Sequence, residues 1–108
     1  MLDEHLTISV SENRHRPVIE LAGDLDLVTA PRLRACLREF TGEHVTVDFS
    51  QVTFVDSTAL GVLVAAHKKT FLSGGSIVLH GVQPAQQRLM EIMGLTGYLY
   101  FDGDGTAA

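Results

Sequence analysis

Strand and helix patterns alternate along this chain, and that alternation limits the fold more than any other feature of the sequence. Residues 44–50 alternate apolar and polar side chains, as a half-buried strand does. Residues 57–72 instead place apolar side chains three and four positions apart, as a helix does, until the segment "SGG" ends the pattern. Because strands joined by helices need crossover connections, the alternation predicts mainly parallel pairing through right-handed crossovers.

The same patterns locate the other elements. Strands are predicted at 6–10, 18–23, 44–50, 76–81 and 98–101, and helices after Thr29, after Asp56 and from Pro84. The polar residues 11–17 are too short for a crossover, so the first two strands should pair as an antiparallel hairpin. We therefore expect an α/β fold whose mixed sheet of about five strands has an N-terminal antiparallel hairpin, parallel crossovers and three helices. Residues 1–108 should form a single domain, with 102–108 as a frayed tail.

Each predicted helix has start and stop signals and one apolar face. Thr29 is a candidate N-cap of the first helix, Pro31 suits its first turn, and Gly42 ends it; Gly94 ends the third helix. The positions expected to face the core are Leu33, Cys36, Leu37 and Phe40 in the first helix, Leu60, Leu63, Val64, His67 and Phe71 in the second, and Ala85, Leu89, Ile92 and Met93 in the third.

Composition excludes several classes of partner. The net charge is −5, with only eight Lys and Arg residues spread along the chain, which argues against binding to nucleic acid or to an anionic membrane. No segment approaches the ~20 apolar residues of a membrane helix, and the N-terminus has acidic residues where an export signal needs basic ones. The single cysteine, Cys36, cannot form an internal disulfide and is expected to be a buried thiol. These features predict a cytoplasmic protein.

The residues that would carry catalysis lack the required spacing. The histidines are His5, His15, His44, His67 and His80. No two of them stand four residues apart, and none lies at metal-ligand spacing from a cysteine or a pair of carboxylates. The glycines at 74 and 75 lack the lysine and following helix of a phosphate-binding loop. A hydrolase elbow needs small residues two positions before and after its serine, whereas bulky Val55 precedes Ser57 by two. We predict no enzyme activity, no catalytic residue, no cofactor and no metal.

The segment "FVDSTALGVL" contains the most informative turn. Asp56 or Ser57 can cap the following helix, which is the structural interpretation. That helix is apolar almost all round and contains Gly61 despite a cost of about 1 kcal/mol relative to alanine, so it is either buried on all sides or presents apolar surface to a partner. A phosphate on Ser57 would be favoured by the positive end of the helix dipole and would add charge beside that surface, which is the interpretation as a binding switch.

Three segments of the chain resemble the STAS domain family, and within it the bacterial anti-sigma-factor antagonists. They are "GDLDLVTAPRL" (23–33), "VDFSQVTFVDSTALGVLVAA" (47–66) and "GGSIVLHGVQPAQQRLMEIMGL" (74–95). The likeness covers nearly the whole chain, and the central segment is the most specific part of it. The chain differs from many members of the family at two places. It has Ala59 where they have glycine, and it ends soon after "YLYFD", where they add another helix.

The resemblance implies a phosphorylation switch. Ser57 matches the serine that the partner anti-sigma factor, an ATP-dependent serine kinase, phosphorylates; Thr58 is the alternative acceptor. The unphosphorylated antagonist binds the kinase and frees the sigma factor, and a serine phosphatase resets the phosphorylated form. Asp24 matches a family position near the acceptor and is expected to help orient it. The expected partner-binding residues are Asp24, Asp56, Thr58, Gly61 and Val62.

Other functions stay open at this point. The family also includes constitutive scaffold and accessory subunits, which would bind partners whatever the state of Ser57. A small nucleotide-binding or hydrolytic protein is the alternative from another class. The short C-terminal segment also raises self-association as a homodimer.

Overall fold

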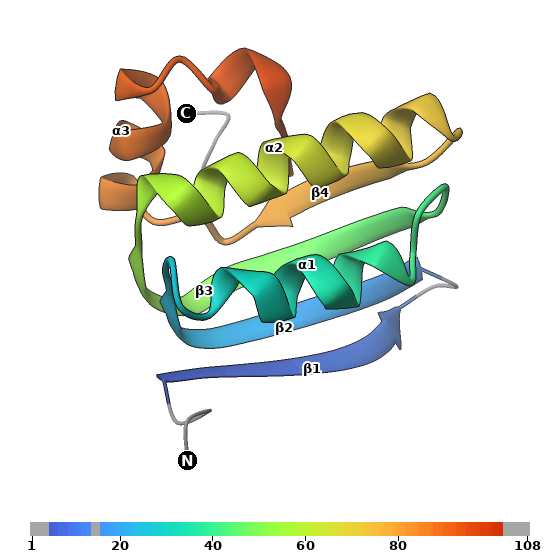
Figure 1. The fold of residues 1–108 in the computed structure, drawn as a ribbon, viewed down its shortest axis with the longest axis horizontal. Coiled ribbons are helices and arrows are strands. Elements are labelled where there is room, and N and C mark those ends of the chain that lie inside the picture. The colour runs from blue at the N-terminus through green and yellow to red at the C-terminus, as the bar shows by residue number, and fades with distance from the viewer. Residues whose placement is uncertain (1–4, 14–15, 103–108) are drawn as a thin grey trace.

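Five strands form one sheet in the order β1-β2-β3-β4-β5 (Figure 1). The computed structural model describes residues 5–13 and 16–102. The strands are β1 (Leu6–Asn13), β2 (Arg16–Leu25), β3 (His44–Val55), β4 (Ser76–His80) and β5 (Tyr100–Phe101). The helices are α1 (Ala30–Arg38), α2 (Ser57–Leu72), α3 (Pro84–Ile92) and a 3₁₀ turn, η2 (Thr96–Tyr98). β1 and β2 pair antiparallel and every later pair is parallel, which confirms the predicted mixed α/β sheet with its hairpin and three helices.

The crossovers from β2 onward all advance in one direction across the sheet. Right-handed crossovers that advance in one direction carry their helices over the same face. Figure 1 shows α1 and α2 side by side on that face, with α3 beyond the N-terminal end of α2. The opposite face carries polar side chains such as Glu20, Thr46 and Asp48. None of the helices within the described residues is long and apolar enough to span a membrane.

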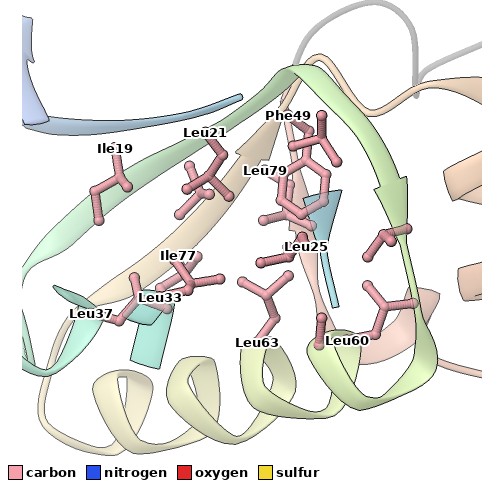
Figure 2. Packing of buried hydrophobic residues seen from close by; sticks show 14 of the residues in the cluster. Ile19, Leu21, Leu25, Leu33, Leu37, Phe49, Leu60, Leu63, Ile77 and Leu79 are labelled. Atoms are coloured by element: carbon pink, nitrogen blue, oxygen red, sulfur yellow. The ribbon is translucent and has the colours of Figure 1, made fainter. Parts of the chain in front are cut away.

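The hydrophobic core lies between the sheet and the pair of helices. Leu60 and Leu63 of α2 point toward the strands, where Leu79 and the fully buried ring of Phe49 lie (Figure 2). Leu33 of α1 packs into the same cluster. Fully burying a side chain of this size stabilises the fold by about 1.5–3 kcal/mol, so these residues fix α1 and α2 against the sheet.

The strands differ in length from the prediction. β3 continues to Val55, five residues beyond the predicted end. Along its pairing with β2 the partners change from Glu20–Asp48 to Ala22–Gln51, so β3 contributes an additional residue there and again before Phe54. Such bulges break the period-two pattern from which the strand was predicted.

Other strand limits were also wrong. Residues 11–13, 16 and 17, predicted as a turn, belong to β1 and β2, and residues 14 and 15 lie outside the described part. Only Tyr100 and Phe101 of the predicted strand 98–101 form β5, because η2 precedes them. Of the predicted frayed tail, 102–108, residues 103–108 lie outside the described residues. Asp102 is not frayed, because its backbone N–H donates to the carbonyl of Leu79 at 3.0 Å.

α1 follows its predicted face but ends early. Leu33 and Leu37 are buried, while Phe40 is half-buried. The helix stops at Arg38, and Gly42 lies in the turn that follows, with φ +88°. Cys36 is half-buried rather than fully buried, and desolvation, with the Glu39 charge second, raises its pKa.

The predicted buried faces of α2 and α3 need correction. Phe71 is 55% exposed, and Val64 is half-buried. In α3, Ala85 and Ile92 are exposed and the buried positions are Gln86 and Met90. Gln86 tolerates burial because its side chain donates to the carbonyl of Val52 and accepts from the backbone N–H of Gln83.

Candidate functional site

Asp56, not Ser57, caps α2. Its backbone is extended (φ −114°, ψ 175°), and its Oδ1 accepts a hydrogen bond from the backbone N–H of Ala59 at 2.9 Å. This arrangement satisfies one of the amides that a helix N-terminus leaves without an internal partner. Ser57 is therefore the first helical residue, and its hydroxyl is not needed for capping.

The second carboxylate oxygen of Asp56 binds a different element. Asp56 Oδ2 accepts from the backbone N–H of Leu27 at 3.0 Å, and the Asp56 N–H donates to the carbonyl of Leu25 at 3.2 Å. Leu27 lies in the loop between β2 and α1. One side chain thus fixes both the start of α2 and the loop that precedes α1.

Asp26 and Thr29 hold that loop from the inside. Asp26 Oδ1 accepts from the backbone N–H groups of Val28 and Thr29 at 2.9 and 3.0 Å. Hydrogen bonds to the charged form, the one from Thr29 first, lower the pKa of Asp26, although desolvation opposes them. The Thr29 hydroxyl donates to the carbonyl of Asp24 and accepts from the backbone N–H of Asp26. Thr29 occupies the predicted N-cap position, but its side chain supports the loop instead of capping α1.

Ser57 and Thr58 lie at the surface of the first turn of α2. Both side chains are exposed, and within the described residues neither hydroxyl makes a hydrogen bond. They stand at the positive end of the helix dipole, where added negative charge is favoured. Both hydroxyls are therefore available to another molecule.

Asp24 lies near the end of β2 and interacts with side chains of two other segments. Its Oδ1 accepts from the Thr53 hydroxyl at 3.1 Å, and its Oδ2 lies 4.0 Å from His5 Nδ1. Among the described residues, no hydrogen bond joins Asp24 to Ser57. Its expected role in orienting the acceptor stays a prediction.

A groove between α1 and α2 brings together several predicted residues. It encloses about 440 Å³. Its lining consists of Arg34, Leu37, Arg38, Thr41, Thr58, Gly61, Val62, Ala65, Ala66 and Lys69. We call it the α1–α2 groove. Thr58, Gly61 and Val62 were predicted to bind a partner, whereas Asp24 and Asp56 are not part of the lining.

Among the described residues, no neighbouring side chain or strand requires a glycine at position 61. It is exposed, and a Cβ added there would meet no atom within 4 Å. α2 is therefore not buried on all sides, because its face toward the groove is open at Gly61 and Ala65. Small residues on an open helix face allow another molecule to approach the backbone closely.

Sequence reasoning missed two sets of residues around this site. Leu27 and Val28 are 65% and 78% exposed in the loop that Asp56 holds. Apolar residues inside a polar loop were the available signal. The charged residues that line the groove are all basic, Arg34 and Arg38 from α1 and Lys69 from α2, and only the packing of the two helices brings them together.

Comparisons with known proteins agree on one family. A family model described as "Mlab, STAS domain" matches residues 8–100. The anti-sigma-B factor antagonist of Bacillus subtilis is 31% identical over 93 residues, which cover 84% of this chain and 85% of that protein.

Two solved structures share the fold. The anti-sigma factor antagonist from Mycobacterium paratuberculosis has a TM-score of 0.79 at 24% identity, covering 92% of this chain and 86% of that one. The phosphorylated form of the Bacillus cell fate determinant SpoIIAA has a TM-score of 0.68 at 19% identity, covering 94% and 96%. The matched family region contains α2, the Asp56 cap and the groove beside them.

Proposed function

The chain belongs to the STAS domain family, and on that premise we propose that it is an anti-sigma-factor antagonist switched by phosphorylation of Ser57. The unphosphorylated protein binds an anti-sigma factor that is also a serine kinase, and so releases a sigma factor. Transfer of phosphate to Ser57 ends the complex, and a serine phosphatase restores the binding form. The role is one of binding, and no reaction is assigned to this chain.

The observation that carries this proposal is the exposed, unbonded hydroxyl of Ser57 on a helix that Asp56 caps. A kinase needs a hydroxyl that can reach its active site without unfolding the substrate. Because Asp56 already satisfies the cap, a phosphate on Ser57 leaves the start of α2 intact. The modification would change the surface and not the fold.

The α1–α2 groove and the adjoining loop are the proposed partner surface. Gly61 and Val62 offer close approach on α2, and Leu27 and Val28 offer apolar contact beside Asp56. The basic lining favours a partner face rich in carboxylates. Such a partner face would repel a phosphate on Ser57, so phosphorylation would weaken binding.

The decisive experiment is phosphorylation by the kinase isolated with this protein from its native cell. Incubation with ATP should add the mass of one phosphate to the wild type and to Thr58→Val, and none to Ser57→Ala. Ser57→Ala should still bind the kinase. Phosphate found on Thr58 would move the switch by one position, and a Ser57→Ala protein that folds but does not bind would contradict the proposal.

The same measurements separate the switch from a constitutive scaffold. A scaffold would bind its partner equally before and after phosphorylation, or with Ser57→Asp. We further propose that residues 1–108 act as a single domain in the cytoplasm, where sigma factors direct transcription. Sedimentation of the purified protein tests the predicted homodimer.

A further inference from the structure

A second cavity lies on another side of α2, away from Ser57. It measures about 450 Å³ and falls between α2 and the segment that leads from α3 into β5, which runs beside α2 in Figure 1. Its lining consists of Val64, His67, Lys68, Phe71, Leu95, Gly97, Tyr98 and Tyr100. The volume is within the usual range for small-molecule sites, and the lining includes both tyrosines of the chain.

His67, one of the lining residues, carries an unpartnered polar atom. The residue is only 5% exposed, and its Nδ1 lies 3.0 Å from the carbonyl oxygen of Tyr98. Because a carbonyl only accepts, Nδ1 must carry the hydrogen, which leaves Nε2 of the neutral ring as an acceptor. Nε2 is buried and has no hydrogen-bond partner in the described structure. Buried polar atoms are normally paired, so this acceptor calls for a donor.

Two aromatic rings lie close to the His67 ring. The centroid of the His67 ring lies 4.7 Å from that of Tyr100 and 6.2 Å from that of Phe71, both in edge-on geometry. Phe71 is 55% exposed and Tyr98 67% exposed, although aromatic side chains gain most when buried. Small-molecule sites are typically lined by apolar and aromatic side chains with a few polar groups, and the lining of this cavity has that composition.

Lys68 adds a charge at the same place. It is the one permanently charged side chain in the lining as far as the structure describes it, and it is exposed. A cation beside aromatic walls disfavours a cationic ligand and favours an anionic group at the entrance. The neighbouring residue, Lys69, faces the α1–α2 groove instead.

We propose that this cavity binds a small aromatic carboxylate that carries a hydroxyl or N–H donor. The ring of the ligand packs against Phe71 and Tyr98, its donor binds His67 Nε2, and its carboxylate lies at Lys68. The ligand reaches Nε2 by displacing the Tyr100 ring, a partly exposed side chain that can change rotamer rapidly. The site is separate from Ser57 and does not depend on the proposed switch.

The test is an NMR titration of the full chain with 4-hydroxyphenylacetate. Saturable amide shifts should appear at Val64, Leu95 and Gly97. Phenylacetate, which lacks the donor, should bind about 3- to 10-fold more weakly, because one neutral hydrogen bond is lost. 2-(4-Hydroxyphenyl)ethanol, which lacks the carboxylate, should bind about 2- to 5-fold more weakly, as for an exposed ion pair.

Matched variants assign each contact. His67→Asn keeps a donor for the Tyr98 carbonyl but has no equivalent of Nε2, so it should bind the hydroxylated and plain acids equally. Lys68→Met should remove the preference for the acid, and Lys69→Met should leave it unchanged.

Several results would overturn the proposal. They are the absence of saturable shifts, shifts confined to the α1–α2 groove, equal affinity of the wild type for all three probes, or a ring-nitrogen spectrum showing a hydrogen on His67 Nε2. The probe series on the wild type decides the matter even where His67→Asn does not fold. Phosphorylation of Ser57 is measured separately, so either proposal can fail alone.

Discussion

The first turns of α1 and α2 begin at the same edge of the sheet, because both helices follow parallel strands, yet they use their hydroxyl groups in opposite ways. At α1, Thr29 is 3% exposed, and its hydroxyl binds two backbone groups. At α2, Ser57 and Thr58 are exposed, and their hydroxyls have no partner among the described residues. A hydroxyl at a helix start is therefore structural in one case and available for chemistry in the other.

The carboxylates account for this difference. Asp26 and Thr29 bind each other's backbone inside one loop, so the Thr29 hydroxyl is needed there. Asp56 caps α2 with one oxygen and holds Leu27 with the other, so it leaves no structural task to Ser57. An independent cap is what allows the next residue to be modified without loss of the fold.

Phosphorylation of Ser57 should have the largest effect, and on binding alone. A partner docked over the turn must desolvate the new charge or face it with carboxylates, so affinity should fall at least 100-fold. The dipole attracts the phosphate and Asp56 repels it, terms of up to about 1 kcal/mol each that largely cancel in the fold. Titrations and thermal melts of both forms measure this. A melting shift above ~8 °C would show that phosphate acts by disordering the first turn.

Asp56→Ala should cause the next largest change, because it removes both hydrogen bonds of the carboxylate. Losing the cap costs about 1 kcal/mol and losing the bond to Leu27 about 1.5–3 kcal/mol, so the free energy of unfolding should fall by about 2.5–4 kcal/mol. Asp56→Asn is the control, since it keeps one acceptor oxygen. Denaturant titrations compare the two variants with the wild type, and an Asp56→Asn protein as stable as the wild type would mean that the second oxygen contributes nothing.

Thr29→Val and Ser57→Ala test the comparison directly. Thr29→Val leaves the Asp24 carbonyl and the Asp26 N–H without their partner, so it should cost about 1–3 kcal/mol. Ser57→Ala removes an exposed, unbonded hydroxyl and should cost less than about 0.5 kcal/mol. Chemical denaturation measures the free energy of unfolding of both variants. Similar losses of stability would mean that the two hydroxyls do not differ in their structural role.

The distinction could be predicted from the sequence only in part. The alternating patterns gave the crossovers, the hairpin and the limits of α2, and "DST" marked the exposed turn. Which residue caps α2 stayed open, because Asp56 and Ser57 are both good capping residues. The bond from Asp56 to Leu27 joins residues 29 apart and depends on how two loops meet at the sheet edge.

Tertiary contacts also explain the wrong predictions. In α3 a polar residue, Gln86, occupies a buried position because its side chain donates to the carbonyl of Val52. The helical periodicity of the sequence does not indicate such a contact. The bulges in β3 follow from its pairing with β2, and one additional residue reverses every later side chain. The basic lining of the α1–α2 groove needs two helices, so neither helix pattern alone could indicate it.

Gly61→Ala should separate folding from binding. The added methyl group meets no atom within 4 Å, and alanine is favoured over glycine in a helix by about 1 kcal/mol, so the protein should become more stable by about that amount. Partner affinity should fall, because the methyl group keeps the partner away from the helix backbone. Ala65→Ser is the comparison variant, because it also adds one atom to a small residue on the groove face of α2. Unchanged affinity of a stabilised Gly61→Ala protein would place the partner elsewhere.

The smallest expected effect concerns the pH dependence of the loop before α1. The pKa of Asp26 lies below its ordinary value of 3.8 because the Thr29 and Val28 N–H groups bind the carboxylate, so the ionised form is favoured in the folded state. Its contribution to stability is complete above the pKa of the unfolded chain and is lost as the pH falls through the lower folded value. Asp26→Asn cannot titrate, so the stability of the wild type relative to this variant should decrease between about pH 5 and pH 2. Urea titrations across that range measure the difference, and a difference independent of pH would show that the Asp26 charge does not hold the loop.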